Sequence, residues 1–158
     1  MPDWIQIVLG ICTPVIAGYS VYIGRQQWKL GAYKLKHDLF EKRWNVYVAT
    51  NDAIVCCING SDEAQRETYQ EFKRKRMDAK FLFPKELNDY LEKINSVISE
   101  LQAAIRNLQS ESLRADSPER SEAEKQVSDQ TEWLRSQIEA IVPMFHEHLD
   151  LSRTMEEL

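Results

Sequence analysis

Glycine is scarce in this sequence, and its few glycines do not form a loop that could hold a phosphate. The 158 residues include five glycines, of which three lie in or at the edge of one apolar run near the N-terminus. Phosphate-binding loops of the Walker and dinucleotide types need several glycines within one short turn. Strand-forming segments are also few, while leucine, glutamate, lysine, glutamine and alanine dominate after residue 25. The composition therefore disfavours nucleotide-binding folds and predicts an all-α protein.

Cysteine and histidine are also sparse, and their spacing indicates neither a metal site nor a catalytic site. The three cysteines are Cys12 and the adjacent pair Cys56 and Cys57, without the C-x-x-C spacing of zinc or redox sites. We interpret them as small buried hydrophobic residues in a reducing compartment. His146 and His148 would point away from each other on a helix, and no histidine follows an arginine at the spacing typical of the helical HEPN ribonucleases. We expect no enzyme activity, no catalytic residue, no metal and no cofactor.

One long apolar run stands out against a charged background. The segment WIQIVLGICTPVIAGYSVYIG, residues 4–24, contains no charged side chain, although charged residues make up 28% of the chain. As an α-helix it would extend about 30 Å, enough to cross the hydrocarbon core of a bilayer. The preceding MPD has no basic residue and VIAGYS is a poor cleavage site, which argues against a signal peptide. The sequence predicts a transmembrane helix over residues 1–24 and a cytoplasmic helical bundle over residues 25–158.

Basic residues after the run predict its orientation. Residues 24–43 carry six basic residues against two acids, whereas the N-terminal flank carries only Asp3. The four basic residues nearest the run would contact anionic lipid headgroups: Arg25, Lys29, Lys34 and Lys36. By the positive-inside rule, we expect the N-terminus outside a bacterial inner membrane and the bundle in the cytoplasm.

Small and polar residues form one stripe along the predicted transmembrane helix. They follow one another at spacings of 4, 3, 4, 3 and 4 residues: Gln6, Gly10, Thr13, Ala17, Ser20 and Gly24. Helices in lipid associate through small residues, which let the backbones approach, and through hydrogen bonds between polar side chains. The stripe therefore favours a homo-oligomer, in which its polar members either pack together or line a pore. Chance and packing against a different membrane protein are the alternatives.

Turn and cap residues divide the rest of the chain into four helices. Gly60 suits a C-terminal cap of the first helix, and Ser61 or Asp62 caps a second helix over about residues 62–78. Pro84 suits the first turn of a third helix. For the fourth helix, Ser117 provides the cap and Pro118 the first residue.

The third helix carries the most regular apolar pattern in the chain. Its apolar residues repeat at spacings of four and three: Leu87, Leu91, Ile94, Ile98, Leu101, Ile105 and Leu108. With short turns between helices, an up-down bundle of about four helices is the simplest fold that buries such a stripe. An intersubunit coiled coil is the alternative use of the same pattern.

A run of four basic residues is the densest charge cluster: Lys73, Arg74, Lys75 and Arg76. Such a run could hold an anionic ligand, for example a nucleic acid, an oligonucleotide signal or lipid phosphates. Four consecutive residues point to all sides of a helix, so a solvated surface is the alternative interpretation.

Two segments, KLKHDLFEKRWNVYVAT and AKFLFPKELNDYLEKI, resemble parts of small, uncharacterised bacterial proteins that join one N-terminal span to an acidic helical bundle. The layout is also similar to that of small membrane effectors of antiphage defence, including the pore-forming accessory protein of RNA-targeting CRISPR systems. The resemblance implies a self-assembling protein that permeabilises the membrane when triggered. Its partners would be membrane lipid, further copies, and a cytoplasmic protein or nucleic-acid-like trigger. A non-conducting scaffold that binds a cytoplasmic partner through its bundle is the alternative function.

Overall fold

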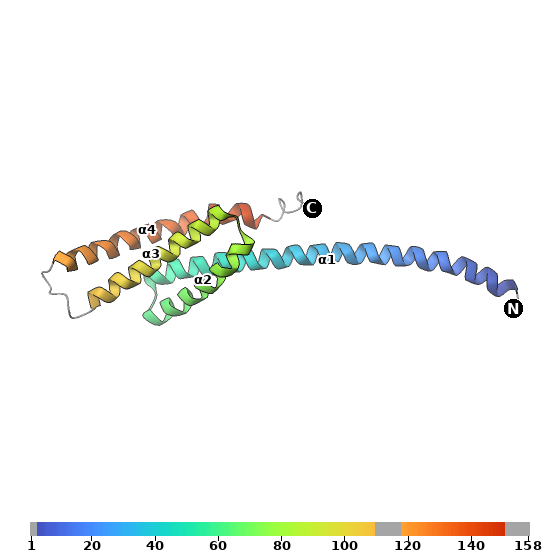
Figure 1. Ribbon diagram of the computed structural model, residues 1–158, viewed down its shortest axis with the longest axis horizontal. Coiled ribbons are helices and arrows are strands. Elements are labelled where there is room, and N and C mark those ends of the chain that lie inside the picture. The colour runs from blue at the N-terminus through green and yellow to red at the C-terminus, as the bar shows by residue number, and fades with distance from the viewer. Residues whose placement is uncertain (1–2, 110–117, 151–158) are drawn as a thin grey trace. The chain divides into compact units, whose positions relative to one another are not determined.

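The described part of the chain folds into α-helices (Figure 1). The computed structural model describes the backbone of residues 3–109 and 118–150, and the side chains of residues 18–109, 118 and 120–150. The four helices are α1 (Asp3–Asn59), α2 (Asp62–Leu82), α3 (Lys85–Gln109) and α4 (Pro118–Leu149), and the described residues include no strand. The predicted all-α class and the number of helices are therefore confirmed.

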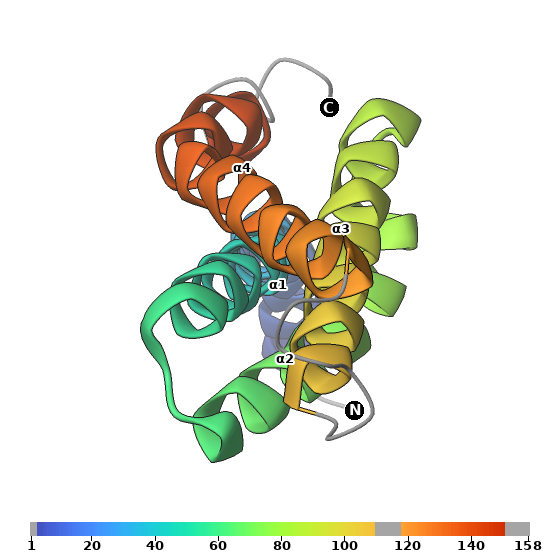
Figure 2. The same cartoon turned by 90° about the vertical axis from the view of Figure 1, so that its left-hand side faces the viewer.

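Packing divides the chain into two compact units, Met1–Leu39 and Phe40–Leu158. The boundary predicted at residue 24, between a transmembrane helix and a cytoplasmic bundle, stays a prediction. The second unit is the helical bundle. In it, α3 packs against both α2 and α4, and successive helices alternate in direction (Figure 1). Viewed from one end, α2 and α4 lie on opposite sides of the bundle, with α1 and α3 between them (Figure 2).

The apolar pattern of α3 forms the centre of the bundle core. Its first five positions, Leu87 to Leu101, are at most 1% exposed, and the last two are half-buried. They pack with residues from each of the other helices, including Ile54, Phe72 and Leu134. This confirms that the pattern is used as core within one chain, where burial of apolar surface is the main stabilising contribution.

The connection between α1 and α2 follows the predicted cap chemistry. The N–H of Gly60 donates to the carbonyl oxygen of Cys56 at 2.7 Å and ends α1. The hydroxyl of Ser61 accepts from the N–H of Ala64 at 3.5 Å, so Ser61 is the N-cap of α2. The far end of α2 lies beyond the predicted residue 78, because Ala79 is fully buried in the core and the helix continues to Leu82.

Gly60 is required because of close approach rather than an unusual backbone angle. A Cβ atom at this position would lie 2.6 Å from the carbonyl oxygen of Cys56, and no described glycine has a positive φ. We expect Gly60→Ala to lower the free energy of unfolding by about 1–3 kcal/mol, measured by chemical denaturation followed by circular dichroism. Gly31→Ala is the matched control, because nothing lies within 4 Å of a Cβ there. Equal stability of the two variants would contradict this explanation.

Candidate functional site

The predicted transmembrane stripe belongs to the N-terminal part of α1. The backbone of residues 3–17 is helical, and the side chains of Gln6, Gly10, Thr13 and Ala17 lie outside the described residues. The remaining two members, Ser20 and Gly24, are exposed. Within the part of the chain that the structure describes, no helix combines the length and apolarity needed to cross a bilayer.

Residues 19–36 of α1, which we call the aromatic–basic segment, carry large side chains that the protein leaves uncovered. Four aromatic side chains are 60–76% exposed: Tyr19, Tyr22, Trp28 and Tyr33. The rings of Tyr19 and Tyr22 stack with centroids 6.5 Å apart, and the amide of Gln26 donates to the Tyr22 hydroxyl at 3.1 Å. Arg25, Lys29 and Lys34 are exposed, and Lys36 is half-buried. Such a mixture of aromatic and basic groups suits the headgroup region of an anionic membrane.

Arg43 binds the C-terminal ends of two helices at once. Its Nε donates to the carbonyl oxygen of Leu82 in α2 at 3.2 Å, and its Nη1 donates to that of His148 in α4 at 2.9 Å. Carbonyl groups in the last turn of a helix have no intrahelical donor, and the end of the helix dipole there favours a positive charge. The guanidinium carbon also lies 5.8 Å from the centre of the Phe83 ring. One side chain of α1 therefore joins α2 and α4.

The sequence analysis counts Arg43 only among the basic residues after the apolar run. A signal for its different role is present in the spacing, because Arg43 precedes the buried residues Val46, Thr50 and Cys57 at helical intervals. An arginine that continues the buried face of a helix is positioned to reach polar groups of neighbouring helices rather than solvent.

Aromatic rings surround the Arg43 contacts. The Phe145 ring packs edge-on against Tyr47 at 5.5 Å and against Phe83 at 5.4 Å, measured between centroids. The His148 ring packs edge-on against Phe83 at 5.9 Å. His148 therefore contributes to packing, whereas His146 is exposed. This aromatic cluster packs around the C-terminal ends of α2 and α4.

The basic run in α2 is not gathered into one surface. The Lys73 ammonium lies 4.6 Å from the centre of the Tyr69 ring, and Arg74 and Lys75 both pair with Glu71. The hydrogen bond with Arg74 lowers the pKa of Glu71 and raises the pKa of Arg74. Because Lys73, Arg74 and Lys75 already have partners within one helix, an anionic ligand would have to compete with Glu71.

Arg76, the last residue of that run, has a structural contact. It pairs with Glu92 of α3, and its side chain is only 16% exposed. Its Nε is buried without a hydrogen-bond partner. Arg76 therefore joins α2 to α3, and the anionic-ligand site stays a prediction for the other members of the run.

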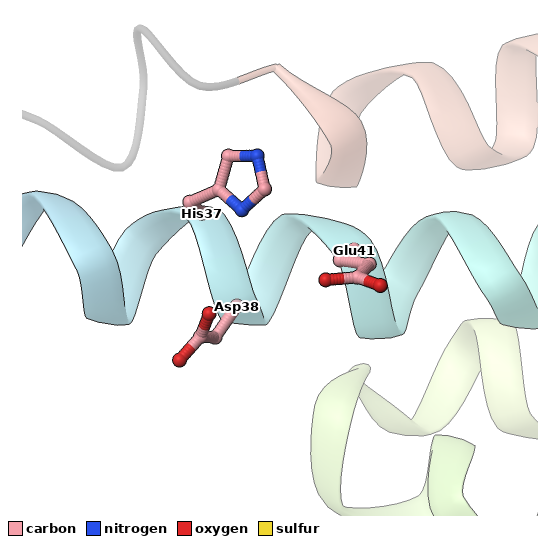
Figure 3. Close-up of side chains that lie close together, drawn as sticks. All are labelled: His37, Asp38 and Glu41. Carbon is pink, nitrogen blue, oxygen red and sulfur yellow. The ribbon is translucent and has the colours of Figure 1, made fainter.

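His37, Asp38 and Glu41 are neighbouring exposed side chains of α1 (Figure 3). Their potential ligand atoms lie within 4.8 Å of one another, the only such group among the described residues. Exposed acidic groups often lie this close without an ion, and no buried polar group supports the cluster. We assign no metal to it.

The predicted burial of the cysteines is confirmed for Cys57. Cys57 is buried and Cys56 is half-buried, while the side chain of Cys12 lies outside the described residues. Burial, with a smaller contribution from Cys56, raises the pKa of the Cys57 thiol from 9.0 to about 11.

This shift predicts a loss of stability in alkaline solution. Between about pH 9 and 11 the unfolded chain loses the Cys57 proton while the folded chain keeps it, so stability that is present below pH 9 falls as the pH rises. Cys57→Val should flatten this part of the curve of unfolding free energy against pH, measured by urea denaturation. Parallel curves for the two proteins would contradict the prediction.

Comparison of the chain with protein-family models, with curated proteins and with solved structures finds no match. The features available for inferring a function are therefore those of this chain: the apolar run, the aromatic–basic segment and the surface of the bundle.

Proposed function

We propose that the chain is a single-pass protein of a bacterial inner membrane that assembles with further copies of itself and makes the membrane permeable. Residues 4–24 form the membrane span, the N-terminus lies outside, and the bundle lies in the cytoplasm. The observation that carries the proposal is the uncharged run, whose end overlaps an aromatic–basic segment with four exposed aromatic side chains.

The exposed side chains of the aromatic–basic segment support a membrane location. Tyr22 and Trp28 each expose more than half of their surface, and Arg25 and Lys29 lie between or beside them. Tyrosine and tryptophan are enriched at membrane interfaces because one end of the ring system is apolar and the other forms hydrogen bonds. A lipid headgroup region would cover the rings and neutralise the cations.

The small-residue stripe supports self-assembly. Packing leucine against leucine gives no hydrophobic free energy inside lipid, because the lipid tails are equally apolar. Helix association there depends on small residues and polar contacts. The stripe supplies both, with Gly10 and Ala17 for close approach and Gln6 and Thr13 for hydrogen bonds. In an assembly of several copies the polar residues would line a path for water and ions. The resemblance in architecture to antiphage effectors supports a role in bacterial defence.

Strong expression of the full chain in bacterial cells tests this proposal, because a high concentration favours assembly without a trigger. We expect the wild-type chain to collapse the membrane potential, reported by a voltage-sensitive dye. Gly10→Leu together with Ala17→Leu should abolish this effect by blocking close approach. Ile11→Leu together with Val15→Leu, on the opposite side of the helix in the sequence pattern, is the matched control.

Replacing residues 4–24 with a polyleucine span distinguishes a membrane-permeabilising protein from a non-conducting scaffold that binds a cytoplasmic partner. The proposal predicts a chain that still inserts but no longer depolarises the membrane. A wild-type chain found in the membrane fraction of cells with a normal potential would contradict it. Unchanged biological activity of the polyleucine chain would favour the non-conducting scaffold.

A further inference from the structure

Two surfaces of the bundle leave large apolar side chains in water. On α2, Phe81 is 92% exposed and Met77 is 55% exposed. On α4, Val142 is 50% exposed and lies beside the exposed Pro143. We call these the α2 face (Arg74, Met77, Phe81) and the α4 face (Glu139, Val142, Pro143).

The two faces lie at the same level of the bundle. The hydrogen bonds of Arg43 to the carbonyl oxygens of Leu82 and His148 bring the ends of α2 and α4 together. Both helices run toward this end (Figure 1). Arg74 precedes Leu82 and Glu139 precedes His148 by similar intervals, about 12–14 Å along each helix. The helices that carry the two faces lie on opposite sides of the bundle (Figure 2).

The charges around the two faces are complementary. The exposed cations on the α2 side are Lys73, Arg74 and Lys80, with Asp78 as the nearby acid. The exposed acids along α4 are Glu122, Glu124, Asp129, Glu132, Glu139 and Glu147, with Lys125 and Arg135 as the exposed lysine and arginine. Arg74 also pairs with Glu71 in its own helix, but exposed pairs of this kind contribute little and exchange readily.

Pro143 adds a polar group to the α4 face. Because proline has no backbone N–H, the carbonyl group of Glu139 lacks its donor within the helix. This carbonyl oxygen belongs to the same residue as the exposed Glu139 carboxylate and is a suitable acceptor for a guanidinium group, which offers several donors in one plane.

We propose that neighbouring copies of the chain pack through their bundles, with the α2 face of one copy against the α4 face of the next. Met77 and Phe81 would cover Val142 and Pro143, while Arg74 would contact Glu139. The inference deepens the proposed function, since it rests on self-assembly and adds the surfaces that assemble outside the membrane.

The geometry favours a second copy over another partner. Two different faces at one level, on helices at opposite sides of the bundle, generate a head-to-tail arrangement, which forms a ring when the rotation closes. Every copy then keeps the same direction, as copies of one single-pass membrane protein must. A two-fold α2–α2 pairing with its axis perpendicular to the helix would instead make the two copies antiparallel, with opposite orientations in the membrane.

Charge exchange in the full chain tests this interface by analytical ultracentrifugation in detergent. Arg74→Glu and Glu139→Arg should each weaken association by at least about tenfold, because like charges then meet across the interface. Combining the two substitutions should restore association, since each copy again presents opposite charges. Phe81→Asp should also weaken association while leaving the melting temperature unchanged. Lys125→Glu, an exposed charge reversal away from the α4 face, is the matched control.

The outcomes separate this inference from the proposed function. If Arg74→Glu and Phe81→Asp associate as strongly as the wild type while Gly10→Leu/Ala17→Leu does not associate, the proposed interface is wrong. Self-assembly through the membrane span would then still stand. Failure of the double charge exchange to restore association would overturn the direct pairing of Arg74 with Glu139. A wild-type chain that does not associate at any concentration would overturn both proposals.

Discussion

Replacement of Phe145 by alanine is expected to lower the free energy of unfolding by about 3–5 kcal/mol. The side chain is fully buried, and its ring contacts those of Tyr47 in α1 and Phe83 after α2. Truncation removes these contacts and leaves a cavity that three separate segments would have to fill. Chemical denaturation of the full chain, followed by circular dichroism, measures the effect.

The adjacent Met144 supplies the matched control for Phe145. Met144 is 39% exposed, so Met144→Ala should cost less than about 1 kcal/mol. Similar losses for the two variants would mean that the aromatic cluster does not hold the end of the bundle together.

Replacement of Arg43 by methionine is expected to lower the free energy of unfolding by about 2–4 kcal/mol. Methionine has a similar length but no donor, so the partly buried carbonyl groups of Leu82 and His148 lose their partner. Arg43→Lys should give an intermediate loss, because an ammonium group keeps the charge but not the forked geometry.

Hydrogen exchange locates the effect of the Arg43 substitution. We expect faster exchange of amides in the last turns of α2 and α4, with little change in the middle of α3. Lys42→Met is the control, since Lys42 is an exposed neighbour of Arg43. Unchanged exchange in Arg43→Met at both helix ends would contradict the assigned role.

Features that depend on local chemistry could be predicted from the sequence. The cap residues Gly60 and Ser61 act through atoms within four residues of themselves, and Pro118 begins α4 as expected. The regular spacing in α3 similarly identifies its buried face without knowledge of the partners. Each of these features depends only on residues within one helix or one turn.

Features that depend on distant contacts could not be predicted in this way. Arg43 finds its acceptors 39 and 105 residues further along the chain. Likewise, the letters FLF do not distinguish Phe81, which is 92% exposed, from Phe83, which is 7% exposed. The exposure of the α2 face therefore depends on how α2 packs against its neighbours, which the local sequence does not specify.

The mass of the full-length chain in detergent, measured by native mass spectrometry, tests self-assembly most directly. The proposal predicts one discrete species of several copies that persists on dilution and is lost in Gly10→Leu/Ala17→Leu. A monomer at every concentration would contradict it, and the apolar run would then act as a simple tether for the bundle.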